Sequence, residues 1–172
     1  GDAFVLRDPN SIRPAYHYID DEVVGVTSER GVIQTAFNVP CNEIKEIPGG
    51  HALIMKKSGD VYLEEIKKPQ ERLACSFERI YFSRGNDKDI YHERIELGKK
   101  LIPTISQAID RDLENTVFSF IPNTAEVAFY GLIKGIERKL NDLKLERIRE
   151  AGSDVSDEEL QKILASRARV EK

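Results

Sequence analysis

The chain has few of the residues that usually build reactive or metal-binding centres. Its 172 residues include no tryptophan, one methionine, two cysteines (Cys41 and Cys75) and three histidines. Two cysteines cannot form a disulfide framework, so a reducing compartment, the cytoplasm, is expected. The histidines His17, His51 and His92 are scattered and show no metal-ligand spacing. The sequence therefore predicts no metal site in this chain.

Long hydrophobic runs and a surplus of positive charge are also absent. No apolar stretch approaches the ~20 residues that a membrane span requires, and the first residues lack the apolar region of a signal peptide. The chain carries 26 Lys and Arg against 30 Asp and Glu, a formal net charge of −4. This balance argues against a nucleic-acid interface. We therefore expect neither a membrane nor a nucleic acid among its partners.

The N-terminal part of the chain, up to Lys68, follows the pattern of a β-rich region. Short apolar or alternating runs are interrupted by turn residues, which is typical of strands joined in hairpins. A short helix is expected beside them, over residues 29–37. The expected strands cover residues 3–6, 15–19, 22–27, 51–56 and 61–66, with turns at Asp20-Asp21 and at residues 57–60.

The charged stretch at residues 67–70 has no apolar period, and the composition changes after it, so we expect a domain boundary there. Beyond residues 75–84, helical spacing dominates. Helices are expected over 90–101, with a kink or restart at Pro103, over 125–150, and after the capping signature at residues 156–159. The pattern also predicts a strand over 116–121, a charged segment 137–150 projecting beyond the core, and a frayed end over 167–172.

The run Cys75-Ser76-Phe77-Glu78-Arg79-Ile80-Tyr81-Phe82-Ser83-Arg84 alternates apolar and polar residues and predicts a half-buried strand. It also resembles the segment that joins the two domains of glutamine amidophosphoribosyltransferases. Arg7-Asp8-Pro9-Asn10-Ser11-Ile12-Arg13-Pro14, followed by Thr27-Ser28-Glu29, is similar to the late glutaminase motif of that family. Phe120-Ile121-Pro122-Asn123-Thr124-Ala125 resembles its first pyrophosphate-contacting loop. The three motifs occur in the family's order.

The resemblance implies a two-part α+β and α/β fold in an internal fragment of a larger enzyme. Residues 1–70 would form the C-terminal part of a β-rich N-terminal-nucleophile glutaminase domain, and residues 73–172 the start of a phosphoribosyltransferase domain. The parent enzyme would pass ammonia from glutamine to phosphoribosyl pyrophosphate, with magnesium as cofactor, and give phosphoribosylamine for purine biosynthesis.

Both chemical centres of the family are missing from this chain. The family's nucleophile is an N-terminal cysteine whose amine is the base, whereas this chain begins with Gly1. The paired acids of the main phosphoribosyl pyrophosphate motif have no counterpart either. We therefore expect no catalytic residues here, and no turnover of glutamine or phosphoribosyl pyrophosphate by the chain alone.

The resemblance assigns four residues to the junction between domains: Cys75, Tyr81, Phe82 and Arg84. Some family members hold an iron–sulfur cluster with one ligand near Cys75, but a cluster needs four thiolates and the chain has two. An iron–sulfur cluster is therefore not expected, and Cys75 is expected to be a small buried residue. Arg7, Asp8 and Arg13 are interpreted as structural ion pairs at the sheet edge.

A strand that leads through a tight loop into a helix N-terminus is a recurring anion site, and residues 116–126 fit this description. Ordinary capping by Asn123 or Thr124 explains the same pattern. The resemblance favours pyrophosphate binding by Asn123, Thr124, Ala125 and Glu126, although the family's acid and glycine are replaced by Asn123 and Ala125. The site is therefore predicted as a binding loop only.

The sequence leaves two other interpretations open. One is a non-catalytic binding or scaffold homologue that kept the fold and lost the sites, which the changes at Asn123 and Ala125 favour. The other is a related amidotransferase with a sugar-phosphate isomerase partner domain, against which the strand-Pro-Asn-Thr-helix junction argues. A homo-oligomer or a rearranged hairpin is expected of the fragment, since an incomplete β-sandwich would leave a sheet edge and an apolar face open.

Overall fold

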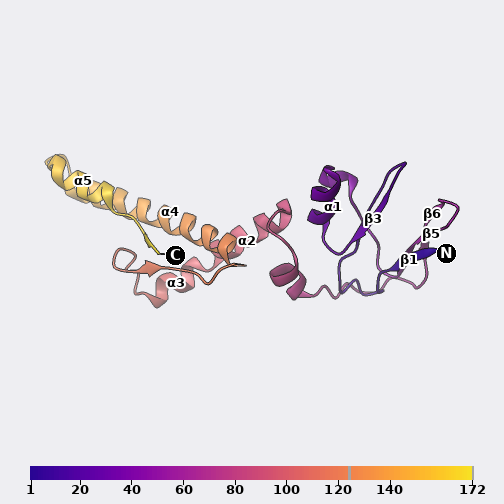
Figure 1. Cartoon of the computed structure of the whole chain (residues 1–172). Coiled ribbons are helices and arrows are strands. Elements are labelled where there is room, and N and C mark those ends of the chain that lie inside the picture. The colour runs from indigo at the N-terminus through magenta and orange to yellow at the C-terminus, as the bar shows by residue number, and fades with distance from the viewer. Residues whose placement is uncertain (124, 172) are drawn as a thin grey trace. The chain divides into compact units, whose positions relative to one another are not determined.

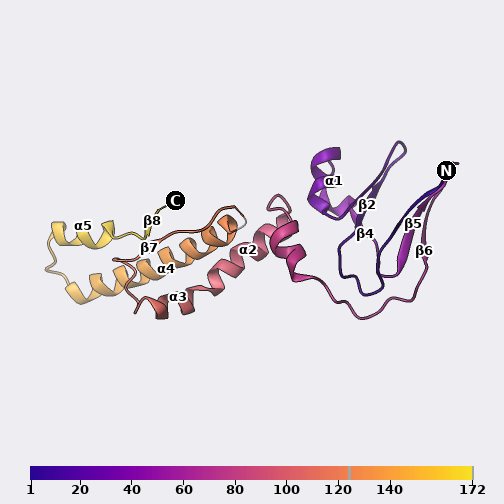
Figure 2. The ribbon, with the colours of Figure 1, turned by 60° about the horizontal axis from the view of Figure 1, so that its bottom comes forward.

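The structure is a computed structural model that describes residues 1–123 and 125–171. The chain divides into two compact units, Gly1–Ile90 and Tyr91–Lys172, whose elements are shown in Figures 1 and 2. Strands dominate the first unit and helices the second. The predicted mixture of helix and strand is therefore confirmed.

The first sheet of the N-terminal unit is antiparallel, with the order β1-β5-β6. Strand β1 (Ala3–Leu6) pairs with β5 (His51–Met55), which pairs in turn with β6 (Val61–Glu65). The strand predicted over residues 3–6 and the hairpin predicted over residues 51–66 are both present. Leu53 in the central strand is 1% exposed and forms part of the core.

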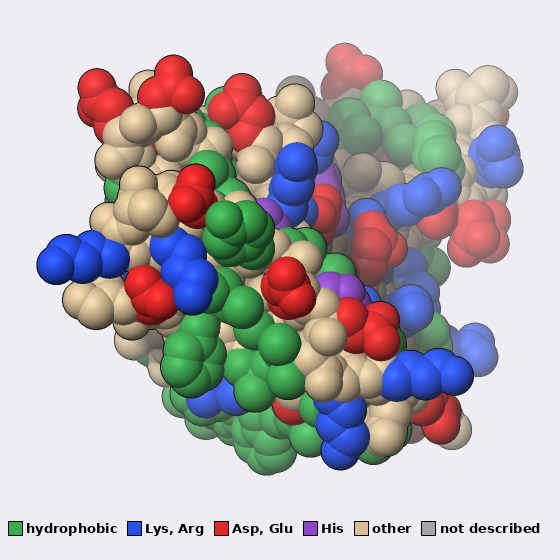
Figure 3. Space-filling view, turned by 90° about the vertical axis from the view of Figure 1, so that its right-hand side faces the viewer, with side chains coloured by type: hydrophobic (Ala, Val, Ile, Leu, Met, Phe, Trp, Pro, Cys, Tyr) green, Lys and Arg blue, Asp and Glu red, His purple; other side chains and the backbone are tan. Residues whose placement is uncertain are grey.

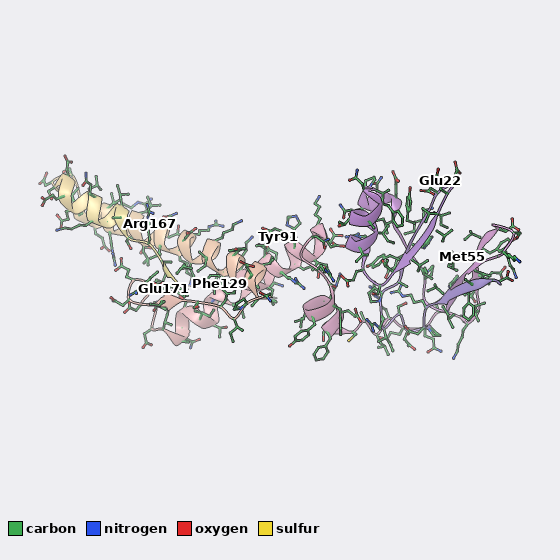
Figure 4. The ribbon with its side chains drawn as sticks, in the orientation of Figure 1. Glu22, Met55, Tyr91, Phe129, Arg167 and Glu171 are labelled. Carbon is green, nitrogen blue, oxygen red and sulfur yellow. The ribbon has the colours of Figure 1, made fainter. Side chains whose placement is uncertain are left out.

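The second sheet has the order β3-β2-β4 and is also antiparallel. Its strands are β2 (Tyr16–Ile19), β3 (Val24–Thr27) and β4 (Lys45–Glu46). The Asp20 carboxylate accepts the backbone N–H groups of Glu22 and Val23, each at 2.8 Å, and thereby forms the predicted acidic turn. Figure 4 labels Glu22 in the turn of this hairpin.

Helix α1 (Arg30–Phe37) follows β3, as predicted, and a 3-10 turn, η1 (Cys41–Glu43), leads to β4. Ile33 of the helix is fully buried, as is Ile47 just after β4. The Phe37 ring stacks on Tyr18 of the sheet with 5.7 Å between centroids. The helix is therefore fixed to the second sheet by its apolar face.

The predicted strand over residues 75–84 is wrong. Glu78–Phe82 form a π-helical turn, η2, closed by the Ser83 N–H donating to the Glu78 carbonyl at 2.7 Å. Phe77 and Tyr81 stack with 5.4 Å between ring centroids. Aromatic residues four apart meet on one helical face, so the run fits a helix as well as a strand. No strand partner is recorded for it in the described part of the chain.

The C-terminal unit is built mainly from helices. These are α2 (Lys88–Lys100), whose first turn belongs to the N-terminal unit, α3 (Ile102–Ala108), α4 (Glu126–Ala151) and α5 (Asp157–Ala165). The helix restart predicted at Pro103 is confirmed, since proline occupies the first turn of α3, where no N–H bond is lost. The predicted capping at Ser156 is also confirmed, because its hydroxyl accepts the Glu159 N–H at 3.3 Å.

The core of this unit lies along one face of α4. Phe129, Leu132, Ile136 and Leu140 on the helix pack with Leu113 and Phe118, and the Phe129 ring stacks on Phe120 at 4.7 Å. Figure 4 labels Phe129 on α4, the helix that carries this core. The apolar first half of the helix therefore covers the strand region, as its sequence predicts.

Two predictions near this core need correction. The expected strand over 116–121 is reduced to β7 (Val117–Phe118), and the expected frayed end contains β8 (Arg169–Val170), which pairs with β7 in parallel. The Glu171 N–H donates to the Phe118 carbonyl at 3.0 Å and extends this pairing. A two-residue strand made by a distant partner leaves no local pattern by which it could be predicted.

The charged half of α4 does not simply project beyond the core, as was expected. Leu140 is buried, and Arg147 forms a bidentate pair with Glu114 at 2.7 and 3.0 Å. Lys144 Nζ donates to the Leu164 carbonyl of α5 at 3.1 Å.

Within the described part of the chain, none of the helices has the length and apolar character needed to cross a membrane.

Candidate functional site

Arg7 is a buried cation that holds three segments of the N-terminal unit together. Its side chain is 4% exposed. The guanidinium donates to the Arg13 carbonyl at 3.0 Å and to the Ile47 carbonyl at 2.5 Å, and it pairs with Glu46 at 2.7 Å. A buried charge requires such partners. The interpretation of Arg7 as a structural ion-pairing residue is therefore confirmed, with Glu46 as its acidic partner.

Asp8 and Arg13 shape the loop that follows. Asp8 accepts the Ile12 N–H through both carboxylate oxygens, at 3.2 Å and 3.0 Å, and so acts as a turn residue. Arg13 pairs with Glu78 at 2.6 Å, and its guanidinium lies 5.3 Å from the centre of the Phe82 ring. Glu78 is 6% exposed, so this pair connects the loop firmly to η2.

Residues 70–75 run beside the same loop. Backbone N–H groups of Gln70, Leu73 and Cys75 donate to the carbonyls of Pro9, Asn10 and Ile12, at 3.0, 2.8 and 3.0 Å. The segment between the two expected domains is thus attached to the first motif rather than free. Cys75 is half-buried with a free thiol, so the expectation of a buried residue is only partly met.

Charged groups connect the start of α1 to the start of α2. Arg30 donates to Asp87 at 2.9 and 2.8 Å and to Asp89 at 2.6 Å. Asp87 in turn accepts the backbone N–H groups of Asp89 and Ile90, at 2.9 Å and 3.3 Å, and so stabilises the first turn of α2. Burial raises the pKa of Asp87, but the Arg30 and backbone hydrogen bonds outweigh it and leave the pKa below its ordinary value.

Two further contacts join the same segments. Arg84 lies 3.3 Å from the Glu29 carboxylate, as an ion pair without hydrogen-bond alignment. A Cβ on Gly31 would lie 2.7 Å from Oδ1 of Asn86, so glycine permits this close approach. The Glu29 of the second motif and the Arg84 of the junction motif are thus neighbours.

These segments enclose a small cavity rich in arginine. Its volume is ≈ 50 Å³, which is room for a few water molecules and not for a nucleotide. Tyr16 lies on its wall, and burial followed by the nearby Glu46 charge raises the pKa of its phenol. Five arginines and three acids line the cavity: Arg7, Arg30, Arg72, Arg79, Arg84, Glu29, Glu78 and Asp87.

This arrangement is suited to rigidity rather than to bond cleavage. The short ion pairs and a carbonyl contact fix Arg7 and Arg30, and a cation so engaged is not available to stabilise a developing charge. Within residues 1–123 and 125–171, no group of three or more His, Cys, Asp or Glu side chains is placed to hold a metal ion. Among the described residues no ligands are therefore assigned to a metal ion or cluster, and no chemical step is placed on them.

The predicted pyrophosphate loop lies in the other unit. Ala125 occupies the N-cap position of α4 with φ −74°, and the Asn123 carbonyl accepts the Glu126 N–H at 3.2 Å. Asn123 thus contributes to the helix start through its backbone. Glu126 also accepts the Tyr130 hydroxyl at 2.8 Å. Thr124 lies outside the described residues.

Comparison with known proteins supports one class. No protein-family model matches the chain. The solved glutamine phosphoribosylpyrophosphate amidotransferase from B. subtilis, complexed with ADP and GMP, is 27% identical with a TM-score of 0.58, over 78% of this chain and 28% of that chain. The chain is thus similar in fold to part of an amidotransferase.

Two curated relatives carry the same name. The amidophosphoribosyltransferase of Lachancea kluyveri is 28% identical over 133 residues, 71% of this chain and 26% of that protein. That of Pasteurella multocida (strain Pm70) is 25% identical over 108 residues, 56% of this chain and 20% of that protein. The resemblance to amidophosphoribosyltransferases is therefore confirmed, and the chain spans about a quarter of the length of the relatives it matches.

The sequence did not single out several residues that define the arginine-rich cavity. Arg30 is expected from the sequence only as part of the helix over 29–37, and Asp87 only as part of a turn over 85–87. The signal that was available is Asp87 at the residue before a helix, where aspartate is a preferred cap. Its pairing with Arg30 joins residues far apart in the chain, which no local pattern predicts.

Proposed function

We propose that this chain is the part of an amidophosphoribosyltransferase that joins its glutaminase and phosphoribosyltransferase domains. In the whole protein, ammonia from glutamine would be transferred to phosphoribosyl pyrophosphate to give phosphoribosylamine. The observation that carries this proposal is the meeting of the first, second and junction motifs at one cavity. The Arg13–Glu78 and Arg84–Glu29 pairs join them at 2.6 and 3.3 Å.

The role of the cavity would be to hold the junction rigid. Cys75, Tyr81, Phe82 and Arg84 are the proposed junction residues, and the Arg13 contact with Phe82 fixes part of η2. The Phe77, Tyr81 and Phe82 rings are each more than half exposed. Such exposed aromatic surface is typical of a site where another part of a protein packs.

The test uses the natural reading frame that contains this chain. Arg13→Ala and Arg84→Ala should loosen the junction, so glutamine hydrolysis should continue while transfer of ammonia falls. We expect the ratio of glutamate to phosphoribosylamine formed to rise by about threefold or more. Arg149→Ala, at an exposed residue of α4, is the matched control. An unchanged ratio in both junction variants, or no amination by the unaltered protein, would contradict the proposal.

We also propose that the 172-residue chain alone releases no ammonia from glutamine. An assay of glutamate formation by the 172 residues tests this.

We also propose that Asn123, Thr124, Ala125 and Glu126 contact pyrophosphate oxygens. Crystals soaked with pyrophosphate and magnesium should show density against the loop, and an empty loop at saturating ligand would count against it.

A scaffold homologue without catalysis is the second candidate, and the loss of the acid at Asn123 favours it. The change to Ala125 does not favour a scaffold, because its φ of −74° is open to any residue and needs no glycine. Measured transfer of ammonia by the full reading frame would exclude the scaffold function.

A further inference from the structure

The C-terminal unit has a polar groove between α3 and α4 that the proposed junction does not involve. Its volume is ≈ 490 Å³, which is ample for a small metabolite. Six residues line it: Pro103, Ser106, Gln107, Asp110, Arg111 and Lys139. The polar side chains come from the end of α3, the turn after it and the middle of α4.

Ser106 and Lys139 form the inner part of the groove. Lys139 Nζ donates to the Ser106 hydroxyl at 3.1 Å, and Ser106 is 6% exposed. Because the ammonium carries three hydrogens, this bond leaves two of them for other acceptors. The hydroxyl accepts from the ammonium, so its own hydrogen is also available to donate.

Arg111 forms the outer part. Its backbone N–H donates to the Ser106 carbonyl at 2.8 Å and thereby fixes its position relative to that serine. Across the part of the chain that the structure describes, neither Arg111 nor Lys139 has an ion pair. The arginines of the N-terminal cavity differ in this respect, since Arg30 is matched by two carboxylates there.

Charge in the groove is therefore unbalanced. Two cations and one carboxylate, Asp110, line it, whereas the whole chain is net negative. Convergent donors with positive charge are the chemistry that recognises phosphate, and an arginine can do so with two parallel bonds. The single carboxylate would repel an anion that approached it directly.

We propose that this groove binds a phosphate group, with Lys139, Arg111 and the Ser106 hydroxyl as donors. The phosphate is either free or part of a phosphomonoester. In the second case Asp110 is placed to accept a hydroxyl of the attached organic group. The proposal does not depend on the proposed function, because it uses no residue of the three motifs.

Isothermal titration of the 172-residue chain with inorganic phosphate tests the site, and glycerol 3-phosphate distinguishes the two sources. We expect saturable binding that weakens about tenfold or more in Lys139→Met and in Arg111→Gln. Lys134→Met removes the same charge from an exposed position of α4 and should leave the affinity unchanged. Tighter binding of glycerol 3-phosphate identifies a phosphomonoester site, and equal binding identifies a site for free phosphate.

Asp110→Asn is expected to tighten phosphate binding, a gain that a misfolded variant would not show. It removes the like charge, and the φ of 52° found at this position is one that asparagine tolerates. Inorganic phosphate should therefore bind several-fold more tightly. The proposal is overturned if phosphate does not saturate, or if Lys134→Met weakens binding as much as Lys139→Met while circular dichroism shows all variants folded.

Discussion

Arg30 is the cationic partner of two carboxylates. It donates to Asp87 and Asp89, and the Asp87 side chain is only 11% exposed. Arg30→Met keeps much of the side-chain length but leaves a mostly buried carboxylate without its partner. We expect the free energy of unfolding to fall by about 2 to 3 kcal/mol, because removing one member of such a pair costs more than the pair contributes.

Urea denaturation followed by circular dichroism measures this loss. Lys88→Met is the matched control, since Lys88 is the exposed residue between the two aspartates. Equal urea midpoints for the two variants would show that the Arg30 contacts do not stabilise the fold.

The ion pair of Glu114 should make the stability of the C-terminal unit depend on pH in the acidic range. The bidentate Arg147 contact, followed by the Ser166 hydroxyl, lowers the pKa of Glu114 from 4.5 to about 2. A lowered pKa in the folded state adds stability above pH 4.5, which is lost as the pH falls from 4.5 toward 2. Because the pair is well exposed, solvent screening limits the effect to about 1 kcal/mol or less.

Glu114→Gln should therefore lower the urea midpoint at pH 7 and have almost no effect near pH 2. Glu137→Gln, at an exposed position of α4, is the control and should change neither. A difference between Glu114→Gln and the unaltered chain that persists unchanged at pH 2 would contradict the assigned cause.

Among individual residues, the sequence predicts well those that cap helices or form turns. Asp20 and Ser156 act on backbone N–H groups within three residues, so their patterns are local. Arg7, by contrast, is identified from the sequence as an ion-pairing residue, but its partner Glu46 is not. Partners of buried charges are fixed by the fold, which is why local sequence patterns do not predict them.

At the scale of elements, α2 and α4 touch through two glycines. A Cβ on Gly98 would lie 1.7 Å from the Ala128 carbonyl oxygen, and one on Gly131 would lie 2.0 Å from that of Ile95. Backbone atoms cannot move aside as a side chain can. The two helices approach this closely only because both positions lack a side chain.

Gly131→Ala should therefore destabilise the C-terminal unit by about 1 to 3 kcal/mol through overpacking, despite the better helix propensity of alanine. Gly135→Ala is the comparison on the same helix, because its Cβ would meet only the flexible end of Ile102 at 1.9 Å. Thermal unfolding should show a clearly larger loss for Gly131→Ala. A larger loss of stability for Gly135→Ala than for Gly131→Ala would indicate that α2 and α4 do not approach each other closely at Gly131.

The elements that the sequence predicts correctly are those with strong local signals. Helix α4 has a long apolar period, and the β5–β6 hairpin has a clear turn between its strands. The turn η2 was mispredicted because a short run with aromatics four apart satisfies both the strand and the helix pattern. Strand β8 was missed because its partner is far away in the chain.

At the scale of the whole molecule, an apolar face of the β1-β5-β6 sheet is open to solvent. Figure 3, which looks onto the end of the chain that carries this sheet, shows hydrophobic side chains gathered together. Phe4 is 70% exposed, and Leu6, Tyr62 and Ile66 are also exposed. Apolar surface of this kind favours association.

We therefore expect the chain to associate with a second copy of itself as its concentration rises. Light scattering across a concentration series measures this, and Phe4→Ser should shift the population toward the monomer. Leu145→Ser is the control, because Leu145 is an exposed apolar residue of α4, outside this sheet and outside the proposed junction. A concentration-independent monomer for the unaltered chain would contradict the expectation.

The parallel pairing of β7 with β8 also bears on synthesis in the cell. Val117 leaves the ribosome well before its partner Arg169, and closing so long a loop costs entropy before the pairing can repay it. Until then Val117 and Phe118 remain without their backbone partner. This part of the nascent polypeptide is where a chaperone would be expected to bind.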